Sequence, residues 1–173
     1  MGEINARAVV EALLFASAEP LSVRDMRQAA PDLGDEAIEG ALVALKNDYE
    51  ATGRAITLEP IAGGWQILTR GEFDPFLKAL RKGAADRGLS QAALETLAVI
   101  AYKQPVGRAD IEAVRGVNAG PILRGLLERG LIRITGRSEV LGHPLLYGTT
   151  DTFLSAFGLN SLEELPKVED VGK

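Results

Sequence analysis

Few residues in this chain combine the types and the spacing that catalytic or metal chemistry requires. His143 is the only histidine and there is no cysteine, so no second residue of either kind can complete a metal site or a catalytic set. The Gly-Gly-Trp stretch at residues 63–65 lacks the Gly-Lys-Ser/Thr ending of a phosphate loop. Glu163, Glu164 and Asp74 have no evident partners that would divide their pKa values into acid and base roles. The sequence therefore predicts a protein that is not an enzyme and that holds no metal or cofactor.

With catalytic and metal chemistry excluded, the sequence still contains a pattern typical of binding, a helix-turn-helix at residues 104–137. Two short helical patterns are joined by a Gly-containing turn and lead into a β-branched strand, which is the order of a winged helix that reads DNA. Residues 87–137 carry eight basic and four acidic side chains, a local charge of +4, although the whole chain has a net charge of −5. A DNA-binding transcriptional regulator is therefore one function to weigh.

The outward face of the predicted second helix of this pattern, residues 120–129, is poorly suited to reading bases. Base edges are usually read by Arg, Lys, Asn or Gln side chains, whereas this face offers Gly120, Pro121, Arg124, Gly125 and Glu128. The corresponding helix of the first half presents several carboxylates, which would face phosphates. Its outward residues are Glu36, Glu39, Gly40, Val43, Asn47 and Glu50. The outward glycines are either tolerated weak positions or places where another polypeptide approaches closely.

The elements that hold these residues recur along the chain. With a shift of 85 positions residues 15–26 lie over residues 100–111, so that Pro20 falls on Pro105 and Asp25 on Asp110. Such self-similarity indicates two copies of one small domain. Helical spacing and turn residues predict helices at 4–18, 35–49, 90–103, 108–115 and 120–129, and strands at 56–59, 65–69, 131–135 and 145–147. A further short helix is predicted to begin at Ser22, which forms a capping-box-like arrangement with Asp25.

These elements predict a mainly α fold with small β wings, built as two tandem winged-helix domains. The expected boundaries are an N-terminal domain at 1–80, a linker at 81–89, a C-terminal domain at 90–166 and a flexible tail at 167–173. The apolar run at residues 9–18 is too short to span a bilayer, and no basic region precedes it. We therefore expect a cytoplasmic protein without a membrane segment.

The opening helix of each copy is apolar almost all round. Residues 9–16 and 92–102 supply nearly continuous Val, Leu, Ile, Ala and aromatic side chains. A helix of this kind must be covered on every side, and a domain of about 80 residues has difficulty covering it alone. A second subunit or a partner chain would supply the cover, although the wing and final helix of the same domain are an alternative.

The order of several short motifs resembles one family over residues 4–166. The second copy contains LETLAVIAY, QPV, RADIE, RGVN, LLERGLI and LLYGTT, and the first contains EALLFASAEPLS and GGWQILTR. Together they resemble the bacterial segregation and condensation protein B family. The resemblance implies two winged-helix domains and a non-enzymatic homodimer that forms mainly through the N-terminal domain.

The resemblance also implies the partners. Members of this family bind the kleisin subunit, segregation and condensation protein A, which bridges the heads of the SMC ATPase in a complex that condenses and separates bacterial chromosomes during cell division. We therefore expect a cytoplasmic, nucleoid-associated protein that contacts DNA weakly or indirectly.

Candidate contact residues follow from the resemblance and from residue type. For the dimer they are Val10, Leu13, Leu14 and Phe15 on the first helix. For the kleisin they lie in the second domain, where tyrosines are common interface anchors and Pro and Gly permit close approach: Tyr102, Val106, Arg108, Pro121, Arg124, Gly125 and Tyr147.

Overall fold

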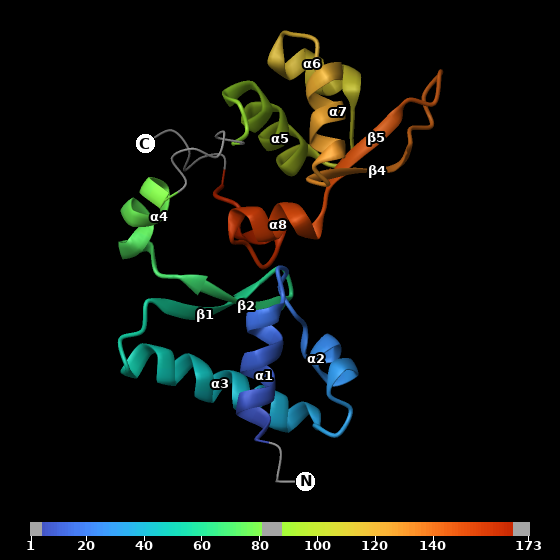
Figure 1. Cartoon of the computed structure of the whole chain (residues 1–173). Helices are drawn as coiled ribbons and strands as arrows, with labels where there is room; N and C mark the ends of the chain where they lie inside the picture. Colours follow the sequence, from blue (N-terminus) through green and yellow to red (C-terminus); the bar gives the residue numbers. More distant parts are fainter. Residues whose placement is uncertain (1–4, 81–87, 168–173) are drawn as a thin grey trace. The chain divides into compact units, whose positions relative to one another are not determined.

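The computed structural model describes residues 5–80 and 88–167 (Figure 1). The chain divides into two compact units, Met1–Ala85 and Asp86–Lys173. Most of the predicted linker, residues 81–87, and most of the predicted tail, residues 168–173, lie outside the described residues, as does the predicted start of the first helix at Ile4.

The first unit has three helices, a two-stranded hairpin and a short closing helix. They are α1 (Ala6–Ala16), α2 (Val23–Ala29), α3 (Asp35–Ala51), β1 (Ile56–Ile61), β2 (Gly64–Thr69), a 3-10 turn (Gly71–Phe73) and α4 (Asp74–Leu80). The predicted capping box begins α2: Ser22 Oγ accepts from the Asp25 amide at 3.1 Å, and the Asp25 carboxylate accepts from the Ser22 amide at 3.0 Å. Ala62 and Gly63, both with positive φ, turn the antiparallel β1–β2 hairpin.

The core of the first unit lies between α1, α2, α3 and β1. Helical spacing brings five residues of α3 to one buried face, where they meet two residues of α1. The buried cluster comprises Val10, Leu14, Met26, Ile38, Ala41, Leu42, Leu45, Tyr49 and Leu58. Trp65 and Ile67 of β2 pack against it.

The second unit repeats this order with one additional short strand. Its elements are α5 (Gln91–Lys103), β3 (Val106–Gly107), α6 (Arg108–Arg115), α7 (Gly120–Glu128), β4 (Ile132–Arg137), β5 (Leu145–Thr149), α8 (Asp151–Phe157) and a 3-10 turn (Leu162–Glu164). The antiparallel sheet has the order β3-β5-β4, and Figure 1 shows β4 and β5 extending beyond the helices as a wing. Its core contains Leu97, Ile100, Ile111, Leu123, Leu126, Ile132, Tyr147 and Phe153.

The two units share a detail that the sequence repeat anticipates. In the second unit, Val106 of β3 pairs with Tyr147 of β5. In the first unit, Leu21 forms an isolated bridge to Trp65, with backbone N···O distances of 3.0 and 2.8 Å, and Leu21 is the residue that the repeat aligns with Val106. Each unit therefore ties the segment after its first helix to its hairpin. The predicted fold class, mainly α with small β wings, is confirmed.

The ends of several elements differ from the predictions. Helix α1 stops at Ala16, two residues before the predicted end, because Ser17 adopts an extended backbone and its hydroxyl bonds to Glu19 O at 2.6 Å. Strands β4 and β5 run two residues further than predicted, to Arg137 and Thr149. Their pairing continues past a register shift between Ile134 and Gly136, which alternation of apolar residues does not reveal.

Candidate partner-binding site

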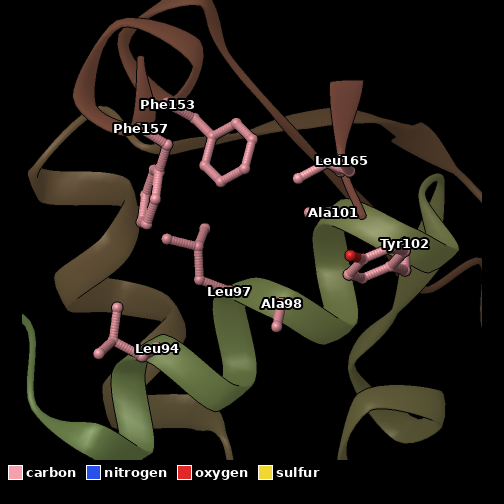
Figure 2. A pocket seen from close by; sticks show the side chains of 8 residues that line it. All are labelled: Leu94, Leu97, Ala98, Ala101, Tyr102, Phe153, Phe157 and Leu165. Carbon is pink, nitrogen blue, oxygen red and sulfur yellow. The ribbon is translucent and has the colours of Figure 1, made fainter. Parts of the chain in front are cut away.

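An apolar hollow opens in the second unit between α5 and α8. Figure 2 shows side chains of the two helices facing one another across it, with Leu165 closing one side. Its volume is about 110 Å³, and its lining is entirely apolar apart from the Tyr102 hydroxyl: Leu94, Leu97, Ala98, Ala101, Tyr102, Phe153, Phe157 and Leu165. Leu94, Tyr102 and Phe157 are 38%, 42% and 45% exposed, so the rim of this hollow is open to solvent.

Helical spacing and one cap explain how the sequence builds this apolar hollow. The α5 residues that line it lie three or four positions apart along one face. On α8, Phe153 and Phe157 are also four apart, and their ring centroids are 4.9 Å from each other. Thr150 fixes the start of α8, since its hydroxyl accepts from the Phe153 amide at 3.2 Å and donates to Gly130 O at 2.6 Å.

The polar group at the rim joins the segment after α8 to α5. The Tyr102 hydroxyl donates a hydrogen bond to Pro166 O at 2.6 Å. An apolar cleft with an aromatic rim and a single polar group is typical of sites that accept apolar side chains from a partner helix.

A second, wider hollow lies in the helix-turn-helix. It has a volume of about 440 Å³ and is lined by Arg108, Asn118, Gly120, Pro121 and Arg124. These residues come from the start of α6, the α6–α7 turn and the first turns of α7. We call this the basic hollow.

Glu112 does not line the basic hollow, but it holds Arg108, which does. Its Oε1 accepts from the Ala119 amide at 2.9 Å and from Arg108 Nε at 2.7 Å. These two contacts, the backbone hydrogen bond first, lower the pKa of the Glu112 carboxyl below its usual value. Glu112 is therefore ionised at neutral pH and holds the Arg108 guanidinium against the α6–α7 turn.

The structure separates the seven residues that were predicted to contact the kleisin. Arg108, Pro121 and Arg124 line the basic hollow, and Gly125 follows on α7, whereas Tyr102 lines the apolar hollow. Val106 and Tyr147 pair across β3 and β5 and belong to the core, with 5% and 8% exposure. These last two side chains are thus not at the surface of the folded unit.

The four predicted dimer residues are also divided between core and surface. Val10 and Leu14 are buried against α3, and Leu13 is half-buried against the same cluster. Phe15 is 84% exposed and is the one member of the set whose ring is open to solvent. The first unit therefore covers one face of α1 and leaves Phe15 uncovered.

Several residues of the apolar hollow were not identified from the sequence. Leu94, Phe153, Phe157 and Leu165 lie in three separate segments, and only the packing of α8 against α5 brings them together. The i, i+4 pair of phenylalanines was the available signal, although such a pair is equally typical of a core helix.

The structural role of the Gln104 side chain was also not predicted from the sequence. Its Oε1 accepts from the Thr149 amide at 2.7 Å, and its Nε2 donates to Thr149 Oγ1 at 2.9 Å and to Ala101 O at 3.2 Å. The side chain thereby fastens the end of α5 to β5, which fixes the helix that carries Tyr102.

Other features add no chemistry to these hollows. In the described part of the chain no group of three or more His, Asp or Glu side chains could hold a metal ion. His143 lies in the wing turn, where its Nδ1 is 3.1 Å from Ser138 O. None of the helices within residues 5–80 and 88–167 has both the length and the apolar character needed to cross a bilayer.

Comparison with known proteins places the chain in a family. The family model described as segregation and condensation complex subunit ScpB matches residues 8–168. Segregation and condensation protein B of Alkaliphilus oremlandii is 42% identical over 164 residues, which cover 95% of this chain and 88% of that protein. The same protein of Symbiobacterium thermophilum is 46% identical over 167 residues, which cover 95% of this chain and 74% of the relative.

Solved structures of the family are also similar. ScpB from Mycobacterium tuberculosis is 35% identical with a TM-score of 0.44, covering 91% of this chain and 99% of that one. A dimer of ScpB N-terminal domain complexed with ScpA peptide is 32% identical with a TM-score of 0.40, covering 43% and 93%. At these TM-scores the assignment depends on the sequence matches alone. Since those matches extend along nearly the whole chain, the protein belongs to the segregation and condensation complex subunit ScpB family.

Proposed function

We propose that this protein is a non-enzymatic subunit of a bacterial SMC–kleisin complex. In this role it binds the kleisin, segregation and condensation protein A, acts with the SMC ATPase through that kleisin, and supports chromosome condensation and segregation. The observation that carries the proposal is the family match over residues 8–168. As part of this proposal, the protein is cytoplasmic and associates with the nucleoid through its complex.

The second unit is the proposed kleisin-binding unit. Two features support this assignment: an open apolar hollow with an aromatic rim, and a basic hollow on the helix-turn-helix. The first unit is the proposed dimerisation unit, because Phe15 leaves a large aromatic ring uncovered on α1.

The exposed side chains of α7 are poorly suited to reading DNA bases, which favours the role of a kleisin-binding subunit over that of a DNA-binding regulator. The exposed positions of α7 are Pro121, Arg124 and Glu128, with half-buried Gly125 beside them. One guanidinium next to a carboxylate supplies few of the Lys and Arg contacts on which DNA binding depends.

Co-purification with mass spectrometry tests the partner directly. We expect the tagged protein to recover the kleisin from cells of its own species. Recovery of the protein alone would contradict the proposal. Sequence-specific duplex binding with nanomolar affinity at about 150 mM salt would favour a regulator instead.

A double variant tests the α7 face. Arg124→Glu with Gly125→Glu should weaken kleisin recovery without unfolding the protein, because both residues lie outside the buried core. Arg133→Glu is the matched control, since Arg133 is an exposed arginine on β4 of the same unit. Unchanged kleisin recovery by the double variant, with circular dichroism like that of the wild type, would show that this face is not used.

A further inference from the structure

The basic hollow differs from an ordinary charged surface because the side-chain oxygen atoms in and beside it already accept hydrogen bonds from the protein itself. Asn118 Oδ1 accepts from the Gly120 amide at 2.9 Å and from Arg108 Nη2 at 3.4 Å. Glu112 Oε1 accepts from Arg108 Nε and from the Ala119 amide. The acceptors around this hollow thus hold the turn and Arg108 in place, and what the hollow offers a ligand is donors.

Arg124 is the donor with the greatest freedom. It is exposed, it lines the hollow, and it makes no hydrogen bond or ion pair with any residue in the part of the chain that the structure describes. Arg108 lies across from it with one side of its guanidinium held by Glu112 and Asn118. Two guanidinium groups therefore line one concave surface. Groups of this type pair best with carboxylates or phosphates, to which they donate two parallel hydrogen bonds.

Glycines shape the hollow so that a polypeptide can approach it. A Cβ at Gly120 would lie 3.2 Å from Arg108 Nη1 and from Asn118 Oδ1, so a side chain there would require these two groups to shift slightly. A Cβ at Gly125 would meet nothing within 4 Å. The α7 backbone is consequently accessible beside Arg124, and nothing in the described part of this unit requires a glycine at position 125.

The charge pattern favours carboxylates over nucleic acid. Glu128 is exposed on α7 one turn after Arg124 and would repel a phosphate backbone that follows this helix. Proteins that bind duplex DNA specifically often make on the order of 6–10 phosphate contacts, whereas the hollow supplies two arginines. A short acidic segment of a polypeptide can place one or two carboxylates in the hollow and avoid Glu128.

We infer that the basic hollow binds an acidic segment of the kleisin, with Asp or Glu carboxylates of that segment paired to Arg124 and Arg108. This inference rests on the proposed function and specifies its chemistry. In regulators the helix-turn-helix binds DNA. Here the same element would bind a polypeptide that, like DNA, is negatively charged.

Affinity measured against salt concentration tests the inference. Purified full-length kleisin is titrated into wild-type protein, Arg124→Gln and Arg133→Gln at about 50 mM and about 300 mM salt, where charge pairs are screened to different extents. Arg133→Gln removes one exposed positive charge of the same unit without touching the hollow. We expect Arg124→Gln to raise the Kd roughly tenfold at the lower salt and to reduce the salt dependence, with little change for Arg133→Gln.

The outcomes separate the two proposals. If the wild type binds the kleisin and Arg124→Gln binds as tightly as Arg133→Gln, the acidic-segment inference is wrong and the proposed function stands. If the wild type does not bind the kleisin, both are wrong. A short duplex DNA is titrated in parallel, and tight duplex binding that Arg124→Gln abolishes would overturn the inference in favour of a phosphate ligand.

Discussion

Two glycines of the second unit, Gly148 and Gly125, differ in the space that a side chain would find. At Gly148, a Cβ would lie 2.8 Å from Gln104 Oε1 and 2.8 Å from Thr135 Cγ2, closer than van der Waals contact allows. Gly148→Ala should therefore displace the Gln104 side chain from Thr149 and lower the free energy of unfolding by about 1–3 kcal/mol. Chemical denaturation measures this change.

Gly125→Ala is the natural control for that experiment. A methyl group at position 125 would enter open space, and alanine is favoured over glycine inside a helix by about 0.5–1 kcal/mol. We expect Gly125→Ala to be slightly more stable than the wild type. Equal destabilisation by both substitutions would contradict the role given to Gln104.

Tyr49 is the buried phenol of the first unit. Its hydroxyl donates to Glu11 Oε1 at 2.7 Å. Burial first, and then the hydrogen bond and the charge of Glu11, raise the pKa of Tyr49 to about 12 from an ordinary value of 10.0. Because the folded-state pKa is above the unfolded value, this group contributes full stability below about pH 10, and the contribution is lost as the pH rises toward 12.

Tyr49→Phe tests that linkage. Near neutral pH the variant should be less stable by about 1 kcal/mol, since Glu11 loses its hydrogen-bond donor. Between about pH 10 and about pH 12 the wild type should lose more unfolding free energy than the variant does. Parallel pH profiles for the two proteins, measured by urea denaturation, would contradict the raised pKa.

At the scale of elements, local signals predicted the positions of α1–α3 and α5–α7, whereas no bounds were predicted for α4 and α8. The Ser22–Asp25 capping box and the Gly-containing turn after Arg115 each depend on residues within a few positions of one another, and the structure contains both. Helix α6 has the predicted bounds, and α7 ends one residue earlier than predicted. Such features can be predicted because their energetics are local.

Features that depend on packing between distant segments could not be predicted in this way. Strand β3 has two residues, which is too short for any alternation to appear, and it exists because β5 pairs with it. The burial of Val106 and Tyr147 follows from that pairing. The apolar hollow likewise requires α8 to pack opposite α5, whereas the sequence pattern of each helix alone is compatible with an ordinary core helix.

At the scale of the whole molecule, Phe15 supplies a test of the proposed homodimer. Phe15→Glu should raise the dimer dissociation constant at least roughly tenfold, because a charge would replace an apolar ring at the proposed subunit contact. Its effect on unfolding should be small, since the ring is 84% exposed. Light scattering over a range of concentrations measures the change.

Two further variants separate assembly from folding. Val43→Glu alters another exposed apolar residue of the same unit, on α3, and should leave the dimer intact. Leu14→Ala removes a buried side chain and should cost about 2–5 kcal/mol of stability. If Phe15→Glu dimerises as tightly as Val43→Glu, or if the wild type is a monomer, the proposal that Phe15 lies at a dimer contact is wrong.

Trp65, which the bridge to Leu21 holds within the first unit, is a natural fluorescent probe of that unit. Trp65 is the sole tryptophan of the chain, and its backbone is bonded to Leu21 within the first unit. Intrinsic emission therefore follows the opening of that unit, whereas far-ultraviolet ellipticity averages over the helices of both. During thermal melting, separate curves from the two signals mean that each unit melts by itself, and superimposable curves mean that the pair melts in one cooperative step.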